Sequence, residues 1–291
     1  MSVRVGIDIG GTQLRVAALD EKSRILRRES FSNDHDAGPR ENLGRLADAI
    51  VGWGLDYEGI GIGCPGPLDF AGGRILNPPN LPGWEGFPVA EFFRERCGHR
   101  CLLNNDANVA GLAEARVGAG AGFASVVYMT VSTGVGAAYV ADGRIVGGAH
   151  SLATEVFNMI VCDAPSARPG MNPGALEDQS SGTAIARMAS QRMGRDVSAP
   201  EVFALADGGD ADALAVLGHA AECLARGVSN INAVVDPDIF VFGGSVALKN
   251  PGFMKMVFRK ARRYVLNPDS LRFCEATCGG DAGLVGAALL V

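Results

Sequence analysis

Residues 3–19, VRVGIDIGGTQLRVAAL, decide how the chain begins to fold. An apolar run from Val3 to Ile9 ends in two glycines, and a second apolar run from Leu14 to Leu19 follows a polar tip. Two apolar runs separated by a short turn predict an antiparallel hairpin.

The tip of this hairpin has the composition of a phosphate-binding turn. Gly10 and Gly11 let backbone N–H groups approach a phosphate closely, and Thr12 adds a hydroxyl donor. Asp8 stands where a carboxylate could hold a water bound to Mg²⁺. The alternative is an ordinary hairpin turn, in which the glycines only supply positive φ angles.

A second turn of the same kind lies near the middle of the chain. Residues 130–136, TVSTGVG, run from a strand pattern into a turn that contains Thr133, Gly134 and Gly136. Apolar stretches and the turn signal Asp142-Gly143 then repeat the strand–turn–strand pattern of the N-terminus. One such turn in each half predicts that two turns grip a polyphosphate.

A third glycine pair follows the apolar run 239–242. Gly243 and Gly244 offer a place where the backbone approaches an adenosine group closely, although a plain strand end would also explain a lone glycine pair.

The polar cluster Asn104-Asn105-Asp106 separates a short strand pattern from a helical pattern over 107–117. A carboxylate close to the phosphate-binding turns can accept the proton of an attacking hydroxyl, so Asp106 is the predicted general base. Asn and Asp are also common helix caps, and one residue can serve both roles.

Bulk properties narrow the class of protein. The 291 residues are 47% hydrophobic, with a formal net charge of −6 and no dense Lys/Arg block, which argues against nucleic acid as a ligand. The absence of a signal-like or spanning apolar run predicts a cytoplasmic protein that does not use a membrane. Seven scattered cysteines fit small core residues in a reducing compartment.

The repeated pattern predicts two α/β lobes. The first covers residues 1–116 and is joined by a C-terminal helix at about 281–291, while the second covers 117–280, after a glycine-rich break at 118–122. The Gly/Pro-dense segment 65–88 is too long for an ordinary connection, so it is expected to carry function.

Taken together, these motifs resemble the ROK group of bacterial sugar kinases and repressors, over nearly the whole chain. The resemblance rests on Asp8-Ile9-Gly10-Gly11-Thr12, Pro65-Gly66-Pro67, Asn80-Leu81-Pro82-Gly83-Trp84, Asn104-Asn105-Asp106-Ala107-Asn108, Thr133-Gly134-Val135-Gly136, Glu177 before Ser181-Gly182, and Gly243-Gly244-Ser245. It implies an actin-like ATPase (ribonuclease H-like) fold with two lobes and a cleft between them, Mg²⁺ and ATP as cofactors, and a homodimer.

The resemblance also assigns roles. It makes Asp106 the catalytic aspartate, and it gives the sugar site Gly66, Asn80, Asn105, Asp106, Glu155, Asn158 and Glu177. Carboxylates suit sugars because each accepts two hydroxyl hydrogen bonds. Without the motif, Glu155 and Glu177 would be read as solvated surface charges.

The chain departs from the family at its zinc motif. The family's Glu-x-Gly-His segment and its Cys-x-Cys-Gly-x-x-Gly-Cys loop supply four zinc ligands, and these positions hold Asn158, Arg168, Gly170 and Ala175. Structural zinc needs about four nitrogen or sulfur ligands, so no structural zinc is expected. Prolines or packing must then hold the loop that presents Glu177.

The leading expectation is a kinase that transfers phosphate from ATP to a hydroxyl of a hexose or N-acyl-hexosamine, and the hydroxyl expected to react is the one at carbon 6. The alternatives are a catalytically weak sugar or nucleotide sensor and a ROK-type regulator without a DNA-binding module. A helix-turn-helix is not expected, because the first phosphate turn already begins at Asp8.

Overall fold

The computed structural model describes residues 2–291, which form two compact units. The first contains the chain up to Gly122 together with Ala138–Ala153 and Thr277–Val291, and the second contains Phe123–Ala137 and Thr154–Ala276. The grouping departs from the predicted lobes chiefly at residues 138–153, which the sequence assigned to the second lobe. Arg116 explains part of this difference, because its Nε donates to the Gly143 carbonyl at 2.8 Å.

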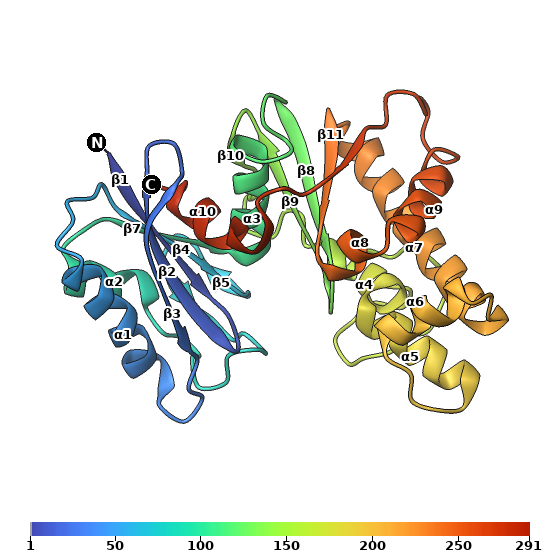
Figure 1. The fold of residues 1–291 in the computed structure, drawn as a ribbon, viewed down its shortest axis with the longest axis horizontal. Helices are drawn as coiled ribbons and strands as arrows, with labels where there is room; N and C mark the ends of the chain where they lie inside the picture. Colours follow the sequence, from blue (N-terminus) through green and yellow to red (C-terminus); the bar gives the residue numbers. More distant parts are fainter. Residues whose placement is uncertain (1) are drawn as a thin grey trace. The chain divides into compact units, whose positions relative to one another are not determined.

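The first unit is built on a five-stranded sheet in the order β3-β2-β1-β4-β7 (Figure 1). Its strands and helices are β1 (Val3–Ile9), β2 (Gln13–Asp20), β3 (Ile25–Ser32), α1 (Gly38–Gly52), β4 (Ile60–Cys64), α2 (Val89–Cys97), β7 (Cys101–Asn105), α3 (Asp106–Arg116), the 3₁₀ turn η2 (Gly279–Asp281) and α10 (Ala282–Ala288). The short pair β5 (Leu68–Asp69) and β6 (Arg74–Ile75) lies within the long segment 65–88. The predicted hairpin is present, since β1 and β2 pair antiparallel from Val3 opposite Asp20 to Ile9 opposite Leu14.

Helices cover both faces of this sheet. Helices α1 and α2 pack on one face, and α3 and α10 on the other (Figure 1). The close approach of α10 depends on glycine, because a Cβ at Gly61 would overlap the Ala287 carbonyl and a Cβ at Gly6 would overlap the Leu284 carbonyl. The expected C-terminal helix thus completes the core of the first unit.

A buried carboxylate secures the points where the chain leaves and re-enters this unit. Glu114 is fully buried and accepts hydrogen bonds from the backbone N–H groups of Ala119 (3.0 Å), Thr277 (3.1 Å) and Cys278 (2.7 Å). Three N–H donors compensate for the desolvation of the charge.

The second sheet has the order β10-β9-β8-β11-β12. The elements of this part of the chain are β8 (Ser125–Val131), β9 (Val135–Ala141), β10 (Arg144–Ile145), the 3₁₀ turn η1 (Val156–Asn158), α4 (Leu176–Ser180), α5 (Gly182–Met193), α6 (Ala199–Asp207), α7 (Ala211–Val235), β11 (Ile239–Gly243), α8 (Ser245–Lys249), α9 (Pro251–Ala261) and β12 (Phe273–Glu275). The long helix α7 packs against α4, α5, α6 and α9.

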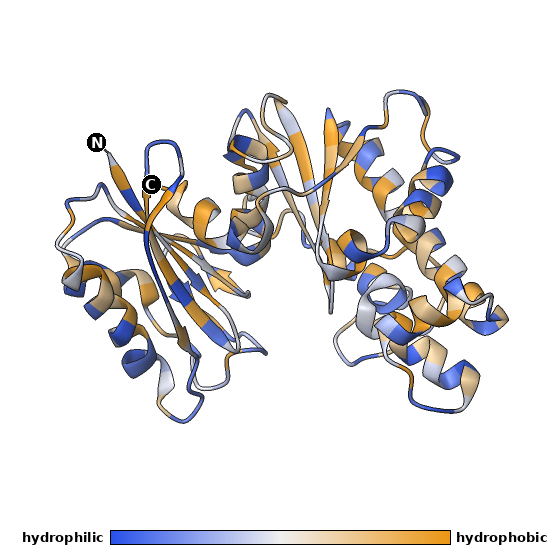
Figure 2. Ribbon diagram, in the orientation of Figure 1, coloured by the Kyte–Doolittle hydropathy of each residue, from blue (hydrophilic) through white to orange (hydrophobic). Residues whose placement is uncertain are grey.

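The pattern of hydropathy explains these layers. Strand β11, which lies between β8 and β12, is buried at every position, and surface helices such as α1 have an apolar and a polar face (Figure 2). Among residues 2–291, no helix combines the length and the apolar character needed to cross a bilayer.

Candidate active site

In the first unit, the predicted site residues meet at the carboxyl ends of three parallel strands. Asp8 lies beside Gly63 across the β1–β4 pair, and Gly63 lies beside Asn104 across the β4–β7 pair. Cys64 and Asn105 are paired one position further along. Parallel strands expose their carboxyl ends at one edge of a sheet, and such edges commonly bind ligands.

Asp106 is the first residue of α3 and is placed by the cap before it. The side chain of Asn105 caps the helix by accepting a hydrogen bond from the Ala107 N–H at 2.9 Å. Asp106 Oδ1 accepts from the same N–H at 2.8 Å, and its side chain remains accessible to solvent. The capping role that competed with catalysis therefore belongs mainly to Asn105.

The surroundings of Asp106 favour a carboxyl group that holds its proton more tightly than usual. Desolvation raises the pKa of Asp106, the negative charge of Asp8 raises it further, and the hydrogen bond from Ala107 opposes both effects. A raised pKa brings a carboxylate closer to the proton affinity that a general base needs.

Asp8 forms an ion pair with Arg15, which sequence reasoning missed. Arg15 Nε donates to Asp8 Oδ2 at 3.0 Å, and Arg15 Nη1 donates to the Gly280 carbonyl at 2.6 Å. Helix α10 also approaches Asp8, because a Cβ at Gly283 would lie 2.9 Å from its carboxyl group. The register of the hairpin places Arg15 directly opposite Asp8, so the hairpin pattern contained the signal for this pair.

The phosphate-type turn is held by Asn33. The Asn33 side chain donates to the Gly10 carbonyl at 3.0 Å, and its backbone N–H donates to the Thr12 carbonyl at 2.9 Å. Gly11 lies against Asn80, since an added Cβ would meet the Asn80 carbonyl at 2.9 Å.

The segment 65–88 therefore contributes to the same edge of the sheet. Leu81 and Trp84 are fully buried and anchor it beside the exposed Asn80. Gly66 lies against Asn105, where an added Cβ would be 3.4 Å from the Asn105 amide nitrogen. The first unit thus gathers Asp8, Gly11, Gly66, Asn80, Asn105 and Asp106 in one region.

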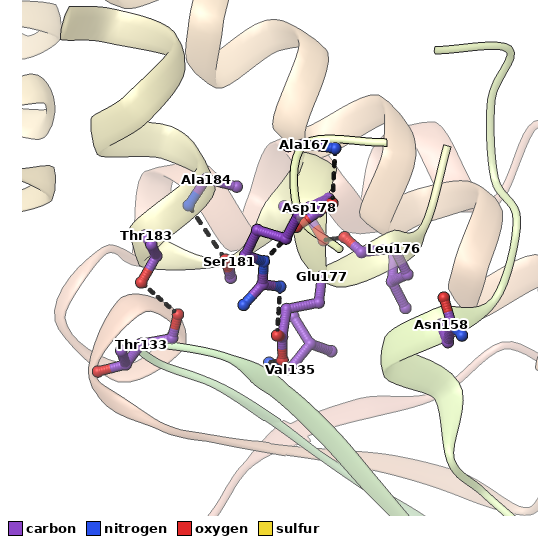
Figure 3. Close-up of polar contacts among 12 residues, drawn as sticks. Thr133, Val135, Asn158, Ala167, Leu176, Glu177, Asp178, Ser181, Thr183 and Ala184 are labelled. Carbon is purple, nitrogen blue, oxygen red and sulfur yellow. Dashed lines mark hydrogen bonds and ion pairs between the residues drawn. The ribbon is translucent and has the colours of Figure 1, made fainter. Parts of the chain in front are cut away.

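In the second unit, Glu177 lies on the Thr133–Gly136 turn (Figure 3). The backbone N–H of Val135 donates to Glu177 Oε2 at 2.8 Å, and a Cβ at Gly134 would lie 2.5 Å from that oxygen. Thr183 Oγ1 at the start of α5 donates to the Thr133 carbonyl at 2.9 Å. The predicted phosphate turn and the predicted sugar carboxylate are therefore adjacent.

Two of the family's zinc positions are occupied by Arg168 and Asn158. Each of these side chains instead forms hydrogen bonds with other residues of the second unit. Arg168 donates to Glu177 Oε1 at 2.6 Å and to the buried Asp178 at 2.7 Å. The Asn158 side chain accepts from the Asn172 N–H at 2.6 Å. A guanidinium cation and an amide do not suit zinc, so these positions do not fit the family's metal.

Glu155 is exposed and immediately precedes η1, the turn that carries Asn158. Two predicted sugar residues of the second unit, Glu155 and Asn158, therefore belong to one short segment. The loop that contains Arg168 leads directly into α4, whose second residue is Glu177.

A pocket of about 450 Å³ opens beside the Thr133 turn. It is lined by the starts of α5, α6 and α8 and by the end of α8, and its lining residues include Thr133, Thr183, Phe203, Ser245, Lys249 and Asn250.

Gly244 has φ +86°, and a side chain there would run into Val131 and Thr130. Gly243 lies against the Tyr128 hydroxyl, and Gly244 is the N-cap residue of α8, whose first residues Ser245 and Val246 line the pocket. Phe203 and Lys249 were missed because they lie outside the motifs.

Comparison with known proteins places the chain in a family. The model of the ROK family matches residues 4–291. The chain belongs to the ROK family. It is 31% identical to a glucokinase of Halalkalibacterium halodurans, over 99% of this chain and 94% of that protein. It is 30% identical to an N-acetylmannosamine kinase of Yersinia pestis, over 99% and 98% of the two chains.

Solved ROK structures share its fold. A ROK hexokinase from Thermus thermophilus superposes with a TM-score of 0.92 at 34% identity, covering 99% of this chain and 97% of that one. A ROK glucokinase from Streptomyces griseus, in complex with glucose and AMPPNP, gives 0.80 at 26% identity, covering 100% and 99%. The predicted ROK membership, the actin-like α/β fold and the enzyme class of sugar kinase are confirmed.

Proposed function

We propose that this ROK protein transfers the γ-phosphoryl group of ATP to a hydroxyl of a hexose or N-acyl-hexosamine, at carbon 6, with Asp106 as the general base. The observation that carries the proposal is the position of Asp106 at the carboxyl end of β7, beside Asp8, with a raised pKa. Phosphoryl transfer needs a group that orients the acceptor hydroxyl and takes its proton, and the remaining catalysis is positioning and charge stabilisation.

We assign sugar-binding roles to residues within each unit separately. In the first unit, Gly66 lies against Asn105, which precedes Asp106 and caps its helix, and Asn80 lies against Gly11 of the phosphate turn. Glu155, Asn158 and Glu177 offer hydroxyl acceptors in the second, and Glu177 already accepts two charge-assisted or backbone hydrogen bonds there. Charged acceptors bind hydroxyls more strongly than neutral ones do.

ATP is assigned to the turns and to the pocket beside Thr133. Gly10, Gly11 and Thr12 form one phosphate turn, and Thr133, Gly134 and Gly136 form the other. The pocket of about 450 Å³ is within the size range of small-molecule sites, and Phe203 and Val246 give it an apolar wall suited to a nucleoside. The support from a relative is the AMPPNP complex of the S. griseus glucokinase.

The residues present also fit Mg²⁺ held through water. Of the two carboxylate oxygens of Asp8, Oδ2 accepts the hydrogen bonds from Arg15, which leaves Oδ1 to accept from a water of the ion. Mg²⁺ usually keeps several waters and binds through one or two carboxylates and the substrate phosphates. When bound, it would neutralise charge on those phosphates, and Arg15 would hold the Asp8 carboxylate in its orientation.

The substitution Asp106→Asn tests the assignment. The amide keeps the shape but cannot accept the proton, so kcat should fall by about 10²- to 10⁴-fold. Sugar binding measured by calorimetry should be nearly unchanged. Asp56→Asn, at an exposed position of the same unit, is the control and should keep full activity.

Stability provides an internal check on this variant. Because the pKa of Asp106 is raised in the folded protein, folding stability falls as pH rises from the ordinary carboxyl value through the folded value. At neutral pH the charged form therefore costs stability, and Asp106→Asn should melt at the same or a higher temperature than the wild type. Retained turnover in this variant would remove Asp106 from the role of base.

The sugar itself is tested by measuring ADP release over a panel that includes glucose and N-acetylmannosamine, the sugars named in two relatives. The kinase proposal expects turnover with at least one sugar and a product phosphorylated at carbon 6. Binding of a sugar without ADP release from any of them would favour the sensor instead. A homodimer remains a prediction that sedimentation can test.

A further inference from the structure

A cluster of two cysteines and one histidine lies in the second unit, away from the turns and pocket described above. Cys162, His219 and Cys223 place their ligand atoms within 4.8 Å of one another. It is the one such group of three or more found across residues 2–291. None of its members stands at the family's zinc positions.

The geometry matches that of a metal site. Cys223 Sγ and His219 Nε2 are 3.6 Å apart. A sulfur at about 2.3 Å and a nitrogen at about 2.0–2.1 Å from one tetrahedral zinc ion lie about 3.6 Å from each other, and two such sulfurs lie about 3.8 Å apart. The three side chains therefore need little movement to surround one ion.

Their arrangement in the fold favours a stable set of ligands. His219 and Cys223 are one turn apart on α7, so they project from the same face of a rigid helix. Cys162 comes from the segment after η1 and is half-buried, Cys223 is buried, and His219 is exposed, which leaves a path for an ion to enter. The positive charge of nearby Arg226 is paired with Glu222 at 3.2 Å.

We propose that Cys162, His219 and Cys223 bind a Zn²⁺ ion, with water or the Gln179 carbonyl oxygen in the fourth position. Thiolate and imidazole ligands select zinc over Mg²⁺ or Ca²⁺. Gln179 Oε1 lies 2.8 Å from His219 Nε2, so binding would replace that hydrogen bond with the metal and move the ring proton to Nδ1. This proposal departs from the expectation, drawn from the sequence, that the chain binds no structural zinc; that expectation rested on the four loop positions of the family, and the three residues named here lie elsewhere.

A metal ion at this site would stabilise the loop that leads to Glu177, one of the residues proposed to bind the sugar. Val161 donates to the Gly174 carbonyl at 2.9 Å and Ile160 bridges Ala175, so Cys162 stands at the base of the loop that carries Arg168 and leads into Glu177. An ion at Cys162 would fasten this base to α7. A zinc ion here would thus stabilise the loop that carries Arg168 at its base.

The test uses the full chain, reduced and freed of metal with a chelator. Zn²⁺ loading followed by elemental analysis should give roughly one ion per chain. Co²⁺, used as a coloured probe, should give a thiolate charge-transfer band. His219→Ala and Cys162→Ser should each weaken binding by at least about 10-fold, while Cys274→Ser, a half-buried cysteine of the same unit, should not.

The readout is independent of catalysis, so its failure would leave the kinase proposal intact. His219 is exposed, so His219→Ala should keep the fold even where a change at buried Cys223 would not. Zn²⁺ should raise the melting temperature of the wild type and not that of His219→Ala. Absence of uptake by reduced protein, equal affinity in the variants, or a Cys162–Cys223 disulfide whose reduction restores no metal binding would each overturn the proposal.

Discussion

Gly134→Ala tests whether the Thr133 turn and Glu177 work as one unit. In the structure an alanine Cβ would lie 2.5 Å from Glu177 Oε2, about 1 Å closer than ordinary contact, so the carboxylate must move. The φ of Gly134 is not positive, so the backbone itself accepts alanine, and the effect arises from this contact alone.

The magnitude follows from the bond that the displacement breaks. Val135 N–H donates to Glu177 Oε2 at 2.8 Å, and a hydrogen bond to a charged group contributes about 1.5–3 kcal/mol. Lost from transition-state binding, this amount lowers kcat/KM for the sugar by about 10- to 150-fold. Steady-state kinetics with the sugar varied at saturating ATP measures it.

Gly218→Ala is the control for this experiment. Gly218 lies on α7 in the same unit, and nothing stands within 4 Å of an added Cβ there. It should keep full activity and melt no lower than the wild type. The reasoning would be refuted if Gly134→Ala, with an unchanged melting temperature, kept kcat/KM within threefold of the wild type.

Three further predictions concern Asp106, Glu114 and Lys249. The raised pKa of Asp106 places the acid limb of the kcat/KM profile above the ordinary aspartate value, with activity rising as pH rises through it, and a pH–rate series showing the limb at the ordinary value would contradict this. Glu114 accepts hydrogen bonds from three backbone N–H groups, and in Glu114→Gln the amide NH₂ would point at one of these donors. The free energy of unfolding should therefore fall by about 2–4 kcal/mol. Calorimetry measures this loss, with the surface substitution Glu58→Gln as the control. Lys249→Ala should raise KM for ATP by roughly two- to fivefold and leave KM for the sugar unchanged, and an equal rise in both would place Lys249 outside the nucleotide site.

The sequence predicted the elements whose apolar pattern is strong. The first hairpin, the buried strand β4 and the C-terminal helix all lie close to the predicted residues. Strand β3 was missed because ILRRESFS alternates half-buried and exposed positions at the edge of the sheet and carries three charges. Helix α2 was missed because it is short and follows the proline-rich segment directly.

The site was predictable only where its members are close in sequence or belong to a motif. Asp8, Asn105 and Asp106 stand at strand ends, which an alternation of strands and helices already brings to one edge. Cys162 meets His219 and Cys223 only because the segment after η1 packs on α7, and pairing of this kind depends on tertiary contacts that no local pattern encodes. Arg168 was read as a lost ligand, and its replacement contacts with Glu177 and Asp178 required coordinates.

The packing of α10 on β1 and α3 also bears on how the protein is made. A ribosome releases residues 123–276 before it releases the helix that fills the groove over Gly6 and Gly61. During synthesis the first unit therefore waits, with an apolar face of its sheet uncovered, while the second unit can already fold. Chaperone dependence should accordingly centre on the N-terminal half of the nascent chain and end once the last residues emerge.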